Sequence, residues 1–372
     1  MLALMGTALP AGAEDETHYC FGEQPTIKAR SGATVEGTSG PDVIWGGKVI
    51  DGRGGDDVIC SLNGRDEVYG GDGNDKIDAG DDQDTVEGGP GDDYLVGGNS
   101  YHIGWSGGEM VSYEHASGPV NVDLTRGIAT GEGTDTLVDF MGIIGSEYGD
   151  TLRGGSEVWD NGDYIDGRGG DDVLYGAQVT RRNLDMIVGG QGNDRIHGLK
   201  GKDLLFGGEG NDSLFGGGSP DGLWGGPGDD HMDGGRNGAG MFDDCVQYSE
   251  SYPFYVGSPV GITASLTTGT ARGDGTDTFV RVECLGGSEH DDLLFGDSGR
   301  NSLEGNGGND VLKAWRGDDD LFDGGGVDLL LGGRGSDALG SEDSAGGDTF
   351  DGSRGHDECN GDADDIVANC ER

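Results

Sequence analysis

Residues Gly189 to His197 read GGQGNDRIH, and the same nine-residue frame returns in Gly207 to Phe215 (GGEGNDSLF) and in Gly225 to Asp233 (GGPGDDHMD). The shared frame is G-G-x-G-x-D-x-U-x, in which U is a large apolar residue. Its sixth position carries an aspartate that recurs every nine residues: Asp185, Asp194, Asp203, Asp212, Asp221 and Asp230. A short internal repeat predicts a solenoid, because each unit can bury its apolar residue only against neighbouring units.

Each nonapeptide divides into a turn and a short strand. Glycines recur in the G-G-x-G-x-D half, where positive φ is expected, so this half must turn. The x-U-x half is a three-residue strand whose central side chain points to one face. Two units would close one coil of eighteen residues. The apolar positions are therefore predicted to line the interior: Ile187, Ile196, Leu205, Leu214, Leu223 and Met232.

Stacked coils would place turns eighteen residues apart on top of one another, at a spacing of about 4.8 Å. Asp185 would then lie beside Asp203, and Asp194 beside Asp212. Carboxylates at this separation repel each other unless a cation lies between them. Calcium suits such turns because it accepts about six to eight oxygens, backbone carbonyls included, whereas magnesium requires octahedral geometry and keeps its waters. Several Ca²⁺ ions are the expected cofactors.

Six near-perfect units carry a family resemblance: GGDGNDKID from Gly70, GGPGDDYLV from Gly88, GGRGSDALG from Gly332 and the three units quoted above. They resemble the RTX, or haemolysin-type, calcium-binding nonapeptide repeat of secreted bacterial proteins. The resemblance implies an all-β fold, a right-handed parallel β-roll (β-solenoid), here interrupted by two longer strand-containing coils. It also implies calcium between the turns of adjacent coils, held by position-six aspartates and turn carbonyls. The ligands so implied are Asp56, Asp75, Asp93, Asp171, Asp185, Gly189, Gly190, Gly192, Asp194, Asp203, Gly207, Gly208, Gly210, Asp212, Asp221, Gly225, Gly226, Gly228, Asp230, Asp310, Asp319, Asp328 and Asp337.

Three units depart from the frame. Asn301 stands at an aspartate position, Asp82 replaces the third glycine in the unit of Asp84, and Ser61-Leu62 replace the first two glycines in the unit of Asp66. Calcium sites at these units are predicted to be weak or empty.

Three repeat blocks alternate with two inserts. The blocks cover residues 37–98, 145–235 and 287–372, the last with a disulfide-linked C-terminal cap, and residues 14–36 form an N-terminal cap. The inserts, 99–144 and 236–286, resemble each other: GEGTDTL from Gly131 returns as GDGTDTF from Gly273. Alternating apolar and polar residues with β-branched enrichment predict strands in both. The inserts are expected to be wider coils of the same solenoid.

Composition restricts the function. The chain has 372 residues, of which 82 are Gly and 9 are Pro, a proportion that without a period would favour disorder. The 71 acidic and 23 basic residues give a net charge of −48, which argues against nucleic acid and against anionic membranes as partners. A merely solubilising surface would scatter its acids. Here aspartate is held at one phase of the repeat, which favours metal ligation.

Export and disulfides are expected together. Residues 1–13 read as the apolar core of a secretory signal ending in Ala11-Gly12-Ala13, although a positive n-region is missing. No other stretch is apolar enough to span a membrane. In a secreted or cell-surface protein, six cysteines read as disulfides, and their positions suggest Cys20–Cys60, Cys245–Cys284 and Cys359–Cys370. Zinc is the alternative, and the absence of a C-x-x-C pair weakens it.

A non-enzymatic calcium-binding protein that folds on external calcium is the leading functional hypothesis. The alternative is a calcium-dependent polysaccharide-modifying enzyme, or an adhesin, that uses the inserts or a solenoid flank, and an unidentified protein or polysaccharide partner stays open. The G-x-S-x-G match at residues 104–108 lacks the strand-to-helix setting of a hydrolase, and H-E-x-x-H is absent. Trp45, Phe206, Phe215 and Trp224 share the ninth repeat position, where flank packing is favoured over a sugar-binding stripe.

Overall fold

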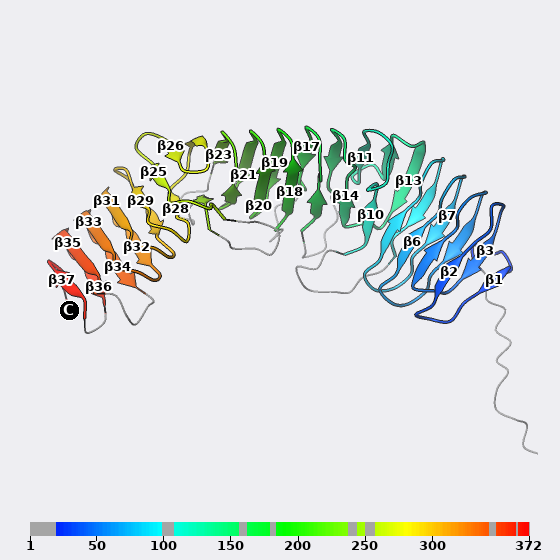
Figure 1. Cartoon of the computed structure of the whole chain (residues 1–372), viewed down its shortest axis with the longest axis horizontal. Helices are drawn as coiled ribbons and strands as arrows, with labels where there is room; N and C mark the ends of the chain where they lie inside the picture. Colours follow the sequence, from blue (N-terminus) through cyan, green and yellow to red (C-terminus); the bar gives the residue numbers. More distant parts are fainter. Residues whose placement is uncertain are drawn as a thin grey trace, which may run out of the picture.

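The computed structural model describes residues 20–98, 108–155, 162–178, 184–236, 244–249, 257–341, 347–361 and 364–371. Within these residues the chain is all-β, and its short strands wind into one elongated, arched solenoid (Figure 1). None of the described residues forms a helix that could cross a membrane. The predicted signal segment, residues 1–13, lies outside the described residues, as does most of the G-x-S-x-G match at 104–108.

Two sheets face each other along the whole solenoid. The larger sheet has 21 strands, one from each regular coil together with the additional strands of the two inserts. Its strands are β1 (Ile27–Lys28), β3 (Val43–Trp45), β5 (Val58–Cys60), β7 (Lys76–Asp78), β9 (Tyr94–Val96), β11 (Asn121–Asp123), β12 (Ile128–Thr130), β13 (Thr134–Val138), β15 (Thr151–Arg153), β17 (Val173–Tyr175), β19 (Arg195–Lys200), β21 (Ser213–Gly218), β23 (His231–Gly235), β25 (Thr263–Ser265), β26 (Thr270–Arg272), β27 (Thr276–Val280), β29 (Leu293–Phe295), β31 (Val311–Arg316), β33 (Leu329–Gly335), β35 (Thr349–Gly355) and β37 (Ile366–Ala368).

The smaller sheet has 16 strands and supplies the other half of each coil. Its strands are β2 (Thr34–Glu36), β4 (Val49–Asp51), β6 (Glu67–Tyr69), β8 (Thr85–Glu87), β10 (Met110–Ser112), β14 (Gly142–Ile144), β16 (Tyr164–Asp166), β18 (Met186–Gln191), β20 (Leu204–Glu209), β22 (Gly222–Trp224), β24 (Cys245–Gln247), β28 (Cys284–Gly286), β30 (Ser302–Glu304), β32 (Asp320–Asp323), β34 (Ala338–Ser341) and β36 (Glu358–Asn360).

The register confirms the predicted coil of eighteen residues. Ile187 pairs with Leu205 in the parallel ladder of β18 and β20, and Ile196 pairs with Leu214 in that of β19 and β21. The six apolar residues predicted for the interior are all fully buried in one continuous core. A thin apolar core suffices here because the inward side chains of the two sheets meet inside each coil and also pack against those of the coils on either side.

Both inserts widen a coil without leaving the solenoid. In the first, β11, β12 and β13 form an antiparallel meander, whose outer strands pair in parallel with β15 and β9. The second repeats this arrangement with β25, β26 and β27 between β29 and β23. The smaller sheet continues past both meanders through β10 and β24. The strands predicted in the inserts are therefore confirmed.

Ninth-position aromatic residues pack along the flanks, as the sequence favoured. Phe206 stacks on Trp224 with ring centroids 4.7 Å apart on the smaller sheet. On the larger sheet Tyr175, His197 and Phe215 form a continuous stack, with successive centroid distances of 5.0 and 4.7 Å. Stacking of like positions on adjacent strands stabilises the register of the coils.

All three predicted disulfides are present: Cys20–Cys60, Cys245–Cys284 and Cys359–Cys370. Cys245 and Cys284 lie directly opposite each other on β24 and β28, with Cα atoms 4.4 Å apart. The other two bridges tie the first and the last described segments to the repeat. Disulfides thus close the ends of the solenoid and its second insert.

Candidate metal sites

Position-six aspartates form two continuous rows, one along each edge where turns run into strands. In each row the backbone amide of one aspartate donates to Oδ1 of the aspartate one coil further on. The distances are 2.7 Å from Asp194 to Asp212 and 2.8 Å from Asp212 to Asp230. On the opposite edge, Asp203 donates to Asp221 at 2.8 Å. The sequence-based pairing of aspartates eighteen residues apart is confirmed.

The second carboxylate oxygen of these residues is buried and lacks a hydrogen-bond partner among the described residues. Burial of an ionised oxygen without a donor is strongly unfavourable, so a row of such atoms has the chemistry of a cation-binding site. This orphaned Oδ2 recurs at Asp57, Asp66, Asp75, Asp84, Asp93, Asp172, Asp194, Asp203, Asp212, Asp221, Asp230, Asp310, Asp319, Asp328, Asp337 and Asp357.

Burial also changes the acidity of the rows. It raises the pKa of Asp212 to about 7, with a further contribution from Asp194. The pKa of Asp203 rises to about 9, because burial is reinforced by the carboxylates of Asp185 and Asp221 on either side. Amides that donate to Oδ1 oppose these shifts without cancelling them. Without a cation, the ionised rows are therefore disfavoured inside the folded coils at neutral pH.

Glycines leave room for the orphaned oxygens. A Cβ on Gly207, at position one, would collide with Oδ2 of its own Asp212 and with the carbonyl oxygen of Gly225. A Cβ on Gly210 would collide with the carbonyl oxygen of Gly192, and Gly210 has a φ of +134° that side chains rarely adopt. The same pattern holds for Gly189, Gly190, Gly192, Gly208, Gly225, Gly226 and Gly228. Carboxylate oxygens and turn carbonyls thus meet in a space that any side chain would fill.

Two predicted ligands lie one residue outside the buried row. In GRGGDDVIC the aspartate of the buried row is Asp57, not Asp56, and in GRGGDDVLY it is Asp172, not Asp171. Asp56 and Asp171 are exposed at position five, where they accept the amides of Asn74 and Asn193. The reason is the strand register, because the fully buried Ile59 and Leu174 each lie two residues after the row aspartate.

Asp185 differs from the other predicted ligands. Its Oδ1 accepts the amide of Asp163 at 2.9 Å, and its Oδ2 accepts the amide of Ala177 at 2.7 Å. Both oxygens therefore have hydrogen-bond partners, and Asp185 lacks the unpartnered Oδ2 that supports a metal site at the row aspartates. Asn301 continues its row without a charge: its backbone amide donates to Oδ1 of Asp319, one coil further on, at 2.8 Å.

The units of Asp66 and Asp84 keep the geometry of the row despite their altered glycines. The amide of Asp66 donates to Oδ1 of Asp84 at 2.8 Å, and both Oδ2 atoms are orphaned like those of regular units. The predicted weakness of these two sites stays a prediction.

The inserts contribute carboxylates that sequence reasoning missed. The amide of Asp93 donates to Asp135 at 3.2 Å, and that of Asp230 donates to Asp277 at 3.1 Å. In both inserts a buried tyrosine caps the other oxygen: Tyr113 donates to Asp135 at 2.8 Å, and Tyr248 to Asp277 at 2.7 Å. The G-x-G-T-D-T runs could have revealed these aspartates, since they match positions two to seven of the nonapeptide.

Three buried carboxylates converge in the third block. Asp323 occupies position one of its unit, where most units have glycine, and both of its oxygens are orphaned. Its carboxylate lies within 4.8 Å of those of Asp310 and Asp328, and all three residues are buried. A Cβ on Gly305 would collide with Oδ1 of Asp323, so the glycine one coil earlier makes room for the extra acid.

Eight segments of the chain match the family model of the RTX calcium-binding nonapeptide repeat: residues 31–48, 49–68, 69–100, 160–178, 185–214, 206–237, 286–321 and 316–339. Together they cover more than half of the 372 residues. The chain belongs to this family. It is a calcium-binding repeat protein of the β-solenoid type. No curated protein matches the sequence.

The RTX turns fit calcium on the evidence of the structure itself. Their orphaned oxygens are hard, anionic and buried, and glycine carbonyls surround them, which is the donor set that Ca²⁺ prefers. The position-six carboxylates and the turn carbonyls would hold the ions between coils. A bound divalent cation supplies the positive charge that keeps adjacent carboxylates ionised inside the fold.

Proposed function

We propose that this RTX protein is a secreted, non-enzymatic calcium-binding protein whose solenoid folds when Ca²⁺ enters the stacked turns. The observation that carries this proposal is the repeated occurrence of buried, orphaned Oδ2 atoms in both rows. Without cations these carboxylates repel one another inside the coils. With cations the same atoms join each coil to the next, so that the free energy of binding becomes free energy of folding.

An extracellular role is supported by the three disulfides and by the charge of the chain. Disulfides persist in oxidising compartments. A chain with a net charge of −48 resists compaction wherever free calcium is scarce. It would therefore stay unfolded in the calcium-poor cytoplasm and fold outside, where sites of about 10⁻⁴ to 10⁻³ M affinity are filled.

The decisive experiment is a calcium titration of the full chain followed by far-ultraviolet circular dichroism. We expect strand signal to appear cooperatively in the millimolar range and to vanish on addition of a chelator. Magnesium at the same concentration is the matched control and should give little strand signal. Equal strand content with and without chelator would overturn the proposal.

The absence of enzymatic activity is part of the proposal and has its own test. The folded chain, with calcium present, would be screened against neutral and acidic polysaccharides for release of reducing ends or unsaturated products. We expect none. Turnover that is lost on chelation would instead support the alternative, a calcium-dependent polysaccharide-modifying enzyme.

A further inference from the structure

A row of arginines runs along one edge of the third repeat block. Arg316, Arg334 and Arg354 occupy position three of successive turns. They lie in register on neighbouring strands, Arg316 opposite Arg334 on β31 and β33, and Arg334 opposite Arg354 on β33 and β35. All three residues are exposed. In a chain with only 23 basic residues against 71 acidic ones, this arrangement is contrary to the overall charge.

The row is not neutralised from within. Arg168 and Arg300 form ion pairs with Glu147 and Asp320, at 2.8 and 2.5 Å respectively. In the part of the chain that the structure describes, none of the three arginines of the row makes such a pair. Like charges opposite each other on adjacent strands are destabilising. A bound anion would relieve the repulsion between these exposed guanidinium groups.

An aromatic platform lies beside the row. Trp315 is 48% exposed, and the ammonium of Lys313 lies 3.8 Å from the centre of its ring. Trp315 has a φ of +78° and stands opposite Gly333, at the turn position that RTX units most often fill with glycine. The same positive φ occurs at this repeat position in Arg53, Leu62 and Leu199, so the regular turn of the solenoid is what presents the indole at the surface.

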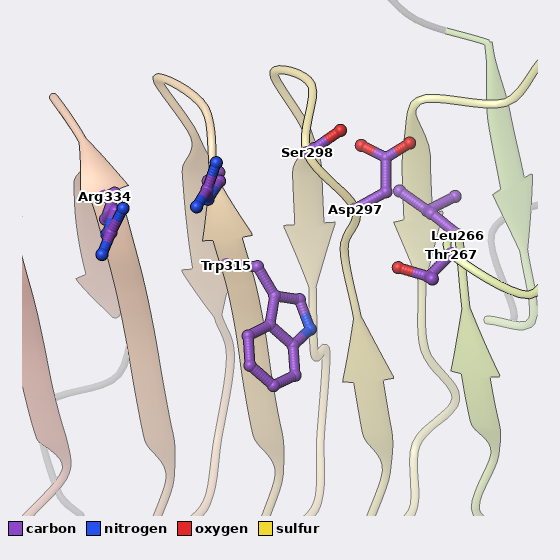
Figure 2. A pocket seen from close by; sticks show the side chains of 7 residues that line it. Leu266, Thr267, Asp297, Ser298, Trp315 and Arg334 are labelled. Carbon is purple, nitrogen blue, oxygen red and sulfur yellow. The ribbon is translucent and has the colours of Figure 1, made fainter.

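Trp315 lines a shallow groove together with Arg316 and Arg334, two of the three arginines of the row, and Figure 2 shows Arg334 and Trp315 on neighbouring strands. The groove has a volume of about 590 Å³, and its other walls are Leu266 and Thr267 of the second insert, with Asp297 and Ser298. Asp297 is held by its own turn, because its Oδ1 accepts the amide of Gly299 at 2.6 Å. The groove thus joins two guanidinium groups, an apolar ring face and hydroxyl groups with one carboxylate, that of Asp297.

We propose that this groove binds a linear acidic glycan. Each guanidinium can pair in bidentate fashion with a carboxylate or sulfate group, and the face of the indole can cover a sugar ring. Guanidinium groups repeat along the row at the inter-strand spacing of about 4.8 Å, which is comparable with the length of one pyranose unit. Carboxylate and sulfate sugars share this chemistry, so the experiment contains an arm for each.

The acidic remainder of the molecule restricts the ligand. At physiological ionic strength, charges further than about 8 Å away are largely screened, so the local row dominates at the groove. A nucleic acid or an anionic bilayer would extend well beyond the row, over surface that carries the −48 charge. A short stretch of acidic sugar is the occupant that fits both the row and its surroundings.

The test is isothermal titration of the full chain in calcium-containing buffer at physiological ionic strength. The probes are an oligogalacturonate and a sulfated oligosaccharide, both too short to gel with calcium, with a neutral glucan oligomer for comparison. We expect at least one acidic oligosaccharide to bind and the neutral one not to bind. The groove assignment is overturned if neither acidic probe binds, or if a single-stranded oligonucleotide or phosphatidylserine vesicles bind more tightly.

Two variants locate the site without disturbing the fold. Arg334→Gln introduces glutamine, which Gln191 shows at the same repeat position in another coil. Trp315→Gly introduces glycine, which Gly333 shows at the same repeat position in the next coil. Each should weaken glycan binding about tenfold, as expected for one charge-assisted contact or one stacked ring. Arg65→Gln, which removes an exposed charge from the first block, should leave binding unchanged. Equal losses in all three variants would overturn the assignment.

The proposal rests on the proposed function only in requiring folded coils, and the two can fail separately. Circular dichroism reports whether calcium folds the chain. The glycan titration is performed under whichever condition gives full strand content. If the chain is folded without calcium and binds the glycan, the groove proposal holds and calcium-driven folding is refuted. If the chain folds only with calcium but does not bind the glycan, calcium-driven folding holds and the groove proposal is refuted.

Discussion

Replacement of Asp212 by asparagine should change stability in opposite directions with and without calcium. Asp212 lies within a row, where its Oδ1 accepts the amide of Asp194 at 2.7 Å and its own amide donates to Asp230 at 2.8 Å. Asparagine keeps the oxygen that accepts the amide. It removes the negative charge at the orphaned Oδ2, which faces the space between coils. The substitution therefore isolates the charge from the shape of the side chain.

With calcium, the substitution should be destabilising. Each filled site contributes about 1.4 to 2.7 kcal/mol when free calcium is about ten to a hundred times Kd. Asp212 has a neighbour in the row on each side, so its charge serves two sites. Loss of both would lower the free energy of unfolding by about 3 to 5 kcal/mol.

Without calcium, the substitution should be stabilising. Burial raises the pKa of Asp212 from 3.8 to about 7, so the ionised form is disfavoured in the folded chain by up to about 4 kcal/mol. Because the folded-state pKa is the higher one, stability from the neutral carboxyl is complete below about pH 4 and is lost as pH rises through about 7. At pH 8 the asparagine avoids this cost, and we expect a gain of about 2 kcal/mol, since its buried amide is also desolvated.

The assay is circular dichroism at pH 8, with urea unfolding in calcium and folding induced by trimethylamine oxide in chelator. Asp229→Asn is the matched control, because Asp229 is exposed at position five, where Asn193 and Asn211 stand in other coils. It should change stability by less than about 0.5 kcal/mol in either buffer. A shift of the same sign with and without calcium for Asp212→Asn would refute the reasoning that calcium balances the charge of the row.

Three further predictions follow from the same geometry. The calcium-free chain should gain strand signal in circular dichroism as pH falls from about 8 towards 4. Burial raises the pKa of Asp75 to about 7 and of Asp221 to about 8, so these carboxylates become neutral over this range and the folded coils become more stable. An unchanged signal over this range would contradict the prediction. Asp323→Gly, which restores the usual residue of position one, should weaken one calcium site about tenfold in isothermal titration, because ligand charge sets affinity; an unaltered isotherm would show that Asp323 does not contact the ion. Gly210→Ala should lower the free energy of urea unfolding in calcium by at least about 1 to 3 kcal/mol, because of its positive φ and the close carbonyl oxygen. Gly218→Ala should be tolerated, because Gly218 does not have a positive φ and no atom lies closer than 3.8 Å to the added Cβ. Equal effects of the two substitutions would refute the steric explanation.

Local periodicity was sufficient to predict the fold. The nine-residue period determines where the chain turns and which side chains point inwards, and the parallel pairing of strands eighteen residues apart follows from it, as in Ile187 with Leu205. The aspartate rows were predictable for the same reason, since partners in regular coils such as Asp194 and Asp212 lie eighteen residues apart. Interactions of this kind depend on sequence spacing alone.

Where the spacing is irregular, sequence reasoning failed. Two adjacent aspartates, as in Asp56-Asp57, can be assigned to the row only once the register of the following strand is known, and the structure places the second of the two in the row. Asp93 and Asp135 are 42 residues apart, and Asp230 and Asp277 are 47 apart, because a meander separates them. The capping tyrosines were invisible to a repeat-based reading, since neither belongs to a nonapeptide.

The sequence by itself determined the solenoid, its period and the calcium chemistry of its turns, because these need only one unit and its identical neighbours. Only the tertiary structure decided which carboxylates converge, as Asp310, Asp323 and Asp328 do, and which charges line up at the surface, as Arg316, Arg334 and Arg354 do. Such groupings depend on how consecutive coils are aligned and on which side chains the stacking leaves buried or exposed. No single repeat carries that information.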